Sequence, residues 1–69
     1  MDTIIEDSLD ARIAQRVRAE RESRAWSLEE LAQRSGVSRA MISKVERQES
    51  APTAALLGRL SAAFGLTLS

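Results

Sequence analysis

An all-α fold, a compact bundle of four or five helices, is predicted by three features of this sequence. Apolar residues recur at the three- to four-residue spacing of a helix in four successive segments. A serine or threonine stands before each of these segments, where its hydroxyl can cap a helix. Glycine or proline follows three of the four segments, as expected where helices end. A chain of 69 residues is enough for one such domain with a small core.

The composition narrows the possible functions. The chain has no Cys and no His, which removes disulfides, thiolate nucleophiles, histidine bases and nearly every zinc or haem site. We therefore expect no metal and no cofactor. Unbroken apolar runs are no longer than the four residues at 54–57, so we predict no transmembrane or signal segment and a cytoplasmic protein.

The charge is unevenly distributed. The total is zero with a pI of about 6.2, which argues against nucleic-acid binding through bulk positive charge. Residues 1–10 contain four acidic residues and no basic one, which leaves ten basic against six acidic residues in 11–69, a net charge of +4. The zero total therefore does not exclude DNA as a partner.

The first helix is predicted at 9–23. Residues 1–8 show no helical period and are expected to form a flexible lead, with Ser8 as the helix cap. Leu9, Ile13 and Val17 then fall on one helical face.

The second helix is predicted at 28–35. Ser27 and Glu30 have the S-x-x-E form of a capping box, and Trp26 and Leu31 have the spacing of a hydrophobic staple. The helix is expected to stop at the following glycine.

The third helix follows after a minimal joint. Only Gly36 and Val37 separate the second helix from Ser38, which can cap a helix that continues to about Arg47. Two helices joined this tightly must cross steeply, which is the helix-turn-helix arrangement, in which the first helix supports the second against a duplex. The pair is expected to share a core of Leu31, Ala32, Val37, Ile42 and Val45.

The fourth helix is predicted at 54–64. Pro52 ends the preceding loop, Thr53 is the cap, and Gly65 closes the helix. The residues expected to face inward are Leu56, Leu57, Leu60, Ala63 and Phe64.

The segments "SLEELAQRSGVS", "KVERQESAP" and "TAALLGRLSAAFGLTLS" resemble the lambda-repressor-like, or xenobiotic-response-element, helix-turn-helix family over about residues 9–66. The sequence of these segments is most similar to the DNA-binding domains of regulators that carry a cupin sensor domain. The resemblance implies a helix-turn-helix domain at 9–69 that binds double-stranded DNA in a bacterial transcriptional regulator, of repressor type. It also implies a homodimer on a palindromic operator, a cupin sensor domain in a longer protein, and a cytoplasmic, nucleoid-associated location.

The resemblance assigns roles to individual residues. Arg39 would read guanine through O6 and N7, Ala40 would offer a methyl contact, and Lys44 would read guanine or neutralise phosphate. The expected base-reading residues are Arg39, Ala40, Ser43 and Lys44, and the expected phosphate-binding residues are Ser27, Ser38, Arg47, Arg16 and Arg18. A solvated helix face or simple helix capping is the alternative for these positions.

A partly buried ion pair between Arg21 and Glu46 is also implied, with a structural role. The sequence departs from the family pattern at Gln48, where glycine is common, so that the third helix runs longer or Gln48 adopts a left-handed conformation. It departs again at Leu28, which replaces a polar residue at the groove edge, and it lacks a fifth, dimerising helix.

Of two other classes of function, an enzyme and a protein-interaction module, only the second remains a serious alternative. The chain is too small for a substrate pocket of the usual size, so we do not expect an enzyme. An antitoxin or protein-interaction module with the same fold is the alternative, and a steep salt dependence of duplex binding would distinguish DNA binding from it. The carboxylate pairs available to an enzyme are Glu29 with Glu30, Glu20 with Glu22, and Glu46 with Glu49.

Overall fold

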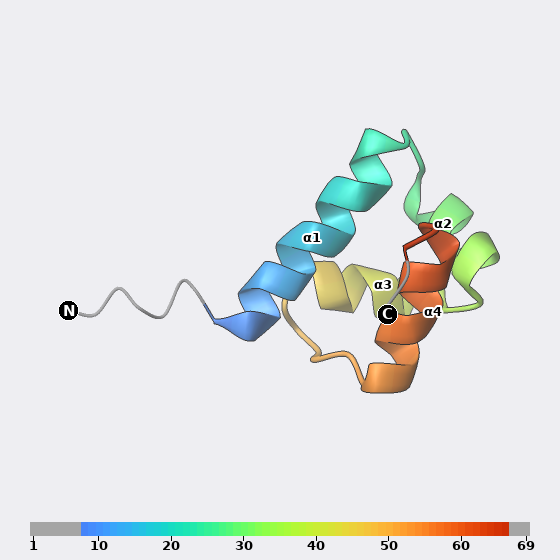
Figure 1. Ribbon diagram of the computed structural model, residues 1–69. Coiled ribbons are helices and arrows are strands. Elements are labelled where there is room, and N and C mark those ends of the chain that lie inside the picture. The colour runs from blue at the N-terminus through green and yellow to red at the C-terminus, as the bar shows by residue number, and fades with distance from the viewer. Residues whose placement is uncertain (1–7, 67–69) are drawn as a thin grey trace.

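The computed structural model describes residues 8–66, which form the predicted all-α arrangement (Figure 1). The helices are α1 (Leu9–Ser23), α2 (Leu28–Ser35), α3 (Arg39–Glu46) and α4 (Ala54–Ala63). In Figure 1, α1 runs diagonally along one side of the molecule, and the three shorter helices gather on the other. The expected flexible lead, apart from Ser8, lies outside the described residues.

The four helices begin where the sequence predicts. Ser8, Ser27, Ser38 and Thr53 each have extended backbone, and each side-chain oxygen accepts a hydrogen bond from the amide three residues later at 3.0–3.1 Å. Each of these caps stabilises its helix by about 1 kcal/mol. Only half of the expected capping box forms, because the Glu30 carboxylate accepts the Nε–H of Arg34, one turn later, at 2.6 Å.

The helix ends differ slightly from prediction. Both α3 and α4 end one residue early, at Glu46 and Ala63. Gly36 ends α2 with φ at 75° and donates its amide to Ala32 O at 2.9 Å.

Gln48 adopts the left-handed conformation, with φ at 61°, so α3 does not run longer. The Gln48 amide donates to Val45 O at 3.1 Å, and the Glu49 amide donates to Lys44 O at 2.8 Å. This pair of bonds is the helix-terminating pattern that normally uses glycine, and a side chain at that φ costs about 1–2 kcal/mol. The same conformation recurs at Ala25, with φ at 59°.

The core lies where α2 and α3 meet and extends to α1 and α4. Leu31 and Ile42 are fully buried at its centre. Because truncating a buried leucine or isoleucine to alanine typically costs about 2–5 kcal/mol, these residues carry much of the stability of so small a domain. The buried cluster consists of Val17, Leu31, Val37, Ile42, Val45, Leu60 and Phe64.

The prediction that Leu9, Ile13 and Val17 form the inner face of α1 is wrong at the N-terminal end of the helix. Leu9 is 70% exposed and Ile13 is only half-buried, whereas Ala14 and Val17 are buried. The face that packs inward therefore follows the buried residues Ala11, Ala14 and Val17 and continues to Arg21, which bonds Glu46 at the end of α3. Leu9, in the first turn, extends beyond the core.

Candidate nucleic-acid interface

Helix α3 has one buried and one exposed face. Ile42 and Val45 point into the core, with 0% and 1% of their surface exposed. This fixes the rotation of α3 about its axis, so the opposite face is held toward solvent. The four predicted base-reading residues are on α3: Arg39, Ala40 and Lys44 are exposed, and Ser43 is half-buried.

Arg21 and Glu46 form the expected ion pair between α1 and the end of α3. Arg21 donates from Nε to Glu46 Oε2 at 2.8 Å and from Nη2 to Oε1 at 3.0 Å, while its Nη1 donates to Trp26 O at 2.9 Å. The two side chains are 14% and 8% exposed. The hydrogen bond that Arg21 donates to Glu46 raises the pKa of Arg21, against the opposing effect of burial.

All three of the expected phosphate-binding arginines are already paired with carboxylates. Arg16 bonds Glu20 at 2.6 Å and Arg18 bonds Glu22 at 3.0 Å, both within α1. The third, Arg47, follows α3 directly and bonds a glutamate two residues later at 3.0 Å. Exposed ion pairs contribute only about 0–1 kcal/mol, so a phosphate group could displace the carboxylate from an arginine that the duplex reaches.

Four other cations take no part in the ion pairs formed within residues 8–66: Arg12 on α1, and Arg39, Lys44 and Arg59. Arg39 and Lys44 were predicted from the sequence, whereas Arg59 was missed. It lies in α4, whose sequence indicates packing rather than binding, and only the fold brings it near the start of α3.

Arg59 borders a hollow of about 360 Å³ between the first turns of α3 and α4. Ser38 and Thr53, the caps of the two helices, also line it. The amides of a first helical turn have no partner within the helix, and together with the helix dipole they favour an anion. The hollow is completed by Gly36, Val37, Met41, Ala55 and Leu56.

The two predicted phosphate-binding serines use their hydroxyl oxygens as caps. Ser27 accepts from Glu30 N at 3.0 Å and Ser38 accepts from Met41 N at 3.1 Å. Both serines are exposed, and each hydroxyl keeps an O–H that can donate to a further acceptor. Capping and phosphate binding are therefore compatible at both positions.

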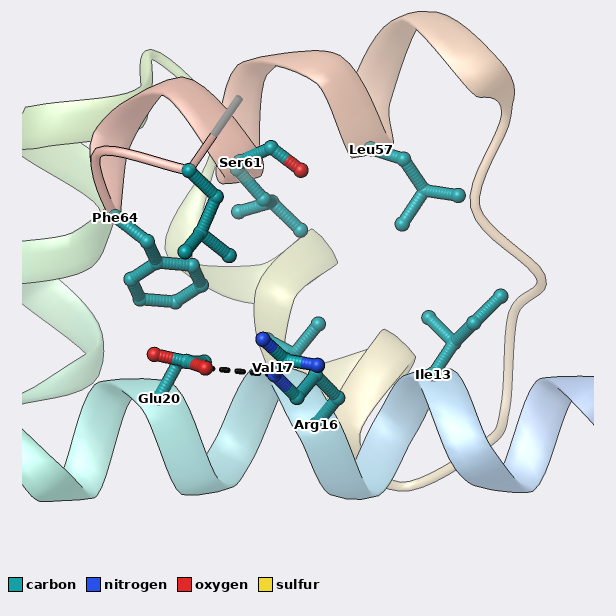
Figure 2. Close-up of a pocket in the computed structure, with 9 residues that line it drawn as sticks. Ile13, Arg16, Val17, Glu20, Leu57, Ser61 and Phe64 are labelled. Carbon is teal, nitrogen blue, oxygen red and sulfur yellow. Dashed lines mark hydrogen bonds and ion pairs between the residues drawn. The ribbon is translucent and has the colours of Figure 1, made fainter. Parts of the chain in front are cut away.

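Arg16 lies away from the exposed face of α3. It borders an apolar groove of about 110 Å³ between α1 and α4, with α3 behind the groove (Figure 2). Figure 2 shows Ile13 and Val17 on α1 facing Leu57 of α4 and Phe64 directly after α4, with Arg16 bonded to Glu20 at the rim.

Leu28 offers no polar side chain to the edge of the DNA groove. It is half-buried and packs on the core cluster. The start of α2 can therefore contribute its backbone amides and the Ser27 hydroxyl to an anion, but not the side chain of its first residue.

Aromatic and arginine side chains join the C-terminal end of α1 to that of α4. The rings of Trp26 and Phe64 stack with centroids 5.9 Å apart, and the guanidinium carbons of Arg24 and Arg34 lie 5.5 and 4.4 Å from the Trp26 centroid. Arg24 also donates to Phe64 O at 2.7 Å. These contacts fix the connector that leads from α1 into α2.

The carboxylates among the described residues offer no arrangement typical of acid–base catalysis. Hydrogen bonds from Arg24 and then Arg16 hold the pKa of Glu20 below its ordinary value, the opposite direction from that needed in a general acid. Glu46 is bonded to Arg21. Within residues 8–66, carboxylates do not gather in a group of three that could hold a metal ion, and none of the helices is both long and apolar enough to cross a membrane.

Taken together, the tight α2–α3 joint, the shared core and the outward face of α3 define a helix-turn-helix domain. The sequence profile of the helix-turn-helix family HTH_3 matches residues 17–69. The chain belongs to this family, whose DNA-binding members are not enzymes.

Two known proteins illustrate the family. The chain is 43% identical over 49 residues to the HTH-type transcriptional regulator SutR of Escherichia coli (strain K12), a match that spans 71% of this chain and 28% of SutR. The fold matches the crystal structure of an HTH_3 family transcriptional regulator from Vibrio cholerae with a TM-score of 0.81 and 38% identity, over 84% of this chain and 33% of that one. The chain thus spans about a third or less of the length of these relatives.

Proposed function

We propose that this chain binds double-stranded DNA sequence-specifically, as the DNA-binding part of a bacterial transcriptional regulator that places α3 in the major groove. The observation that carries the proposal is the orientation of α3. Its apolar side is fixed in the core, and its other side presents Arg39, Ala40 and Lys44 to solvent. A rigidly held helix with short and basic side chains on its outer face suits entry into a groove about 12 Å wide.

The N-terminal half of α3 would read bases. Arg39, at the first position of the helix, is exposed and outside the ion pairs of the described chain, so its guanidinium is available for guanine O6 and N7. Ala40 would contact a thymine methyl group. Ser43 and Lys44 lie one turn further along the same face, with Ser43 able to bond either kind of base.

Phosphate contacts would surround this face and fix its register. Ser27 and Ser38 can each add an O–H to the amides at the starts of α2 and α3. Arg47 follows the end of α3. To these we add Arg59, because it borders the hollow between the first turns of α3 and α4. Arg16 and Arg18, on α1, would act on the duplex only at longer range.

Arg21 and Glu46 would hold α3 in the orientation that reading requires. Their pair connects the end of α3 to α1, so the angle of α3 against the duplex depends on it. We assign this pair a structural role, without contact to DNA.

We further propose that the regulator is of repressor type and binds as a homodimer to a palindromic operator. Two copies of α3 would then lie about 34 Å apart, one turn of the duplex. The relatives are more than twice as long as the matched region, which leaves room in a longer protein for a sensor domain such as a cupin. A DNA-bound regulator of this kind would be cytoplasmic and nucleoid-associated.

The test is selection of genome fragments with this domain fused to a neutral dimeriser, followed by titration of the enriched duplex at two salt concentrations. We expect an enriched palindrome and an affinity that falls steeply as salt rises, because neutralised phosphates release counterions. No enrichment by a domain shown to be folded would refute the proposal.

A protein-interaction module, including an antitoxin, is the second candidate. The apolar groove between α1 and α4 and the 70% exposed side chain of Leu9 favour it. Such a module would bind a protein partner with little dependence on salt and would not enrich any duplex.

A further inference from the structure

Arg47 and Glu49 face each other across one residue directly after α3. Arg47 donates from Nε to Glu49 Oε2 at 3.0 Å and from Nη2 to Oε1 at 3.2 Å. A guanidinium that bonds two carboxylate oxygens adopts the geometry with which it would bond two phosphate oxygens. In the protein without DNA, Glu49 therefore takes up two of the donor groups with which Arg47 would bond a phosphate.

The backbone holds Glu49 in this position. Its amide donates to Lys44 O at 2.8 Å, and Gln48 makes the left-handed turn between the two charged residues. Glu49 is thus tied to the last turn of α3 and would stay beside Arg47 when α3 docks on a duplex.

The charge at this end of α3 depends on Glu49. The neighbouring carboxylate, Glu46, is 8% exposed and bonded through both oxygens to Arg21. Glu49 is by contrast 53% exposed, and Arg47 is 59% exposed. Arg47 and Glu49 together are neutral, so the pair attracts a phosphate less than the arginine alone would.

We propose that Glu49 lowers the affinity of this domain for DNA by competing with a backbone phosphate for Arg47. The proposal rests on the proposed function. Phosphate contacts carry no sequence information, so this competition reduces the binding of all duplexes alike. It would shorten the residence of the regulator on its operator and on unrelated sites alike, and it would leave the specificity ratio between them unchanged.

The test compares the Glu49→Gln variant with the unchanged protein on the selected duplex and on an unrelated duplex. Gln keeps the size of the side chain but removes its charge. We expect a gain in affinity of about 1.4- to 5-fold on both duplexes, the range that an exposed ion pair represents. The dependence of log affinity on log salt should also become steeper, by up to about 0.9, because one more phosphate is fully neutralised.

The matched control is Glu22→Gln. Glu22 pairs with Arg18 at 3.0 Å, with side chains 55% and 63% exposed, so this variant removes the same charge from a similarly exposed pair on α1. We expect little change in affinity or salt slope. In a protein that already carries Arg47→Ala, Glu49→Gln should lose most of its effect.

Three results would overturn the proposal. One is a Glu49→Gln variant that binds with the affinity and salt slope of the unchanged protein. Another is an equal gain from Glu22→Gln, which would assign the effect to total charge rather than to Arg47. A third is a full gain in affinity from Glu49→Gln in the protein that already carries Arg47→Ala. If the unchanged, folded protein binds no duplex, the proposed function fails and this inference fails with it. Duplex binding that is unaltered by Glu49→Gln refutes the inference alone.

Discussion

The ion pair between Arg21 and Glu46 allows the sharpest test of how α3 is held. Truncating one partner leaves the other charge largely buried, since the two side chains are only 14% and 8% exposed. Loss of one partner of a buried pair costs about 3–5 kcal/mol. Partial exposure places the expected loss near the lower limit, about 3 kcal/mol, for Arg21→Met. The total stability of a domain this small is about 3–10 kcal/mol, so the loss would be severe.

The two truncations should differ in size. With Glu46→Ala, the long Arg21 side chain can turn toward water while it keeps Trp26 O as a partner at 2.9 Å. With Arg21→Met, the short carboxylate of Glu46 stays in place without its partner. Arg21→Met should therefore destabilise the domain more than Glu46→Ala.

Thermal unfolding measures these losses, with circular dichroism and the fluorescence of Trp26 as two independent signals. A loss of about 3 kcal/mol corresponds to a melting temperature lower by about 12–24 °C. The double variant Arg21→Met with Glu46→Met removes both charges and should recover most of the stability. A loss below about 1 kcal/mol for Arg21→Met, or a double variant no more stable than either single one, would refute the reasoning.

Four further predictions follow from individual contacts. Arg39→Ala should relax base preference at one or two positions, at a cost of about 1–3 kcal/mol, as measured by repeating the selection; unaltered preference would contradict the docking of α3. Arg59→Ala should weaken all duplexes alike and flatten the salt slope, and a change in base preference would argue against a phosphate contact. Gln48→Gly should raise the melting temperature by about 4–8 °C by relieving about 1 kcal/mol of strain, whereas Gly36→Ala, at a φ of 75°, should lower it. Hydrogen bonds from Arg24 and Arg16 lower the pKa of Glu20 in the folded protein. The stability that the Glu20 carboxylate contributes is therefore present above its unfolded-state pKa of about 4.3 and is lost as the pH falls through its folded-state pKa. Glu20→Gln should remove this part of the acid dependence when unfolding is measured at several pH values.

Much of the fold could be predicted because its signals are local. A helix cap needs only one hydroxyl at the right position, and Ser8, Ser27, Ser38 and Thr53 all cap helices in the structure. The exposed face of α3 follows from the burial of Ile42 on its other side, which the helical period already indicates.

What could not be predicted depends on contacts between segments. Leu9 fits the apolar period of α1, yet it is exposed, because the buried side of its turn carries Ala11 instead. Arg59 becomes a candidate only because α4 brings it near the start of α3. The carboxylate that Arg47 bonds depends on the turn at Gln48, for which the sequence left two alternatives open.

The pairing of arginines explains how a chain with no net charge can still be suited to DNA. The ion pairs on α1 neutralise Arg16 and Arg18 within the helix, and the α1–α3 pair neutralises Arg21. The basic side chains outside the ion pairs of residues 8–66 include Arg39 and Lys44 on the outer face of α3. Because close opposite charges largely cancel at the distance of a bound duplex, the field that a phosphate meets is set by these unpaired cations rather than by the total. It follows that a change of one charge beside α3 should alter DNA binding more than the same change on α1, and this difference is what Glu49→Gln and Glu22→Gln measure.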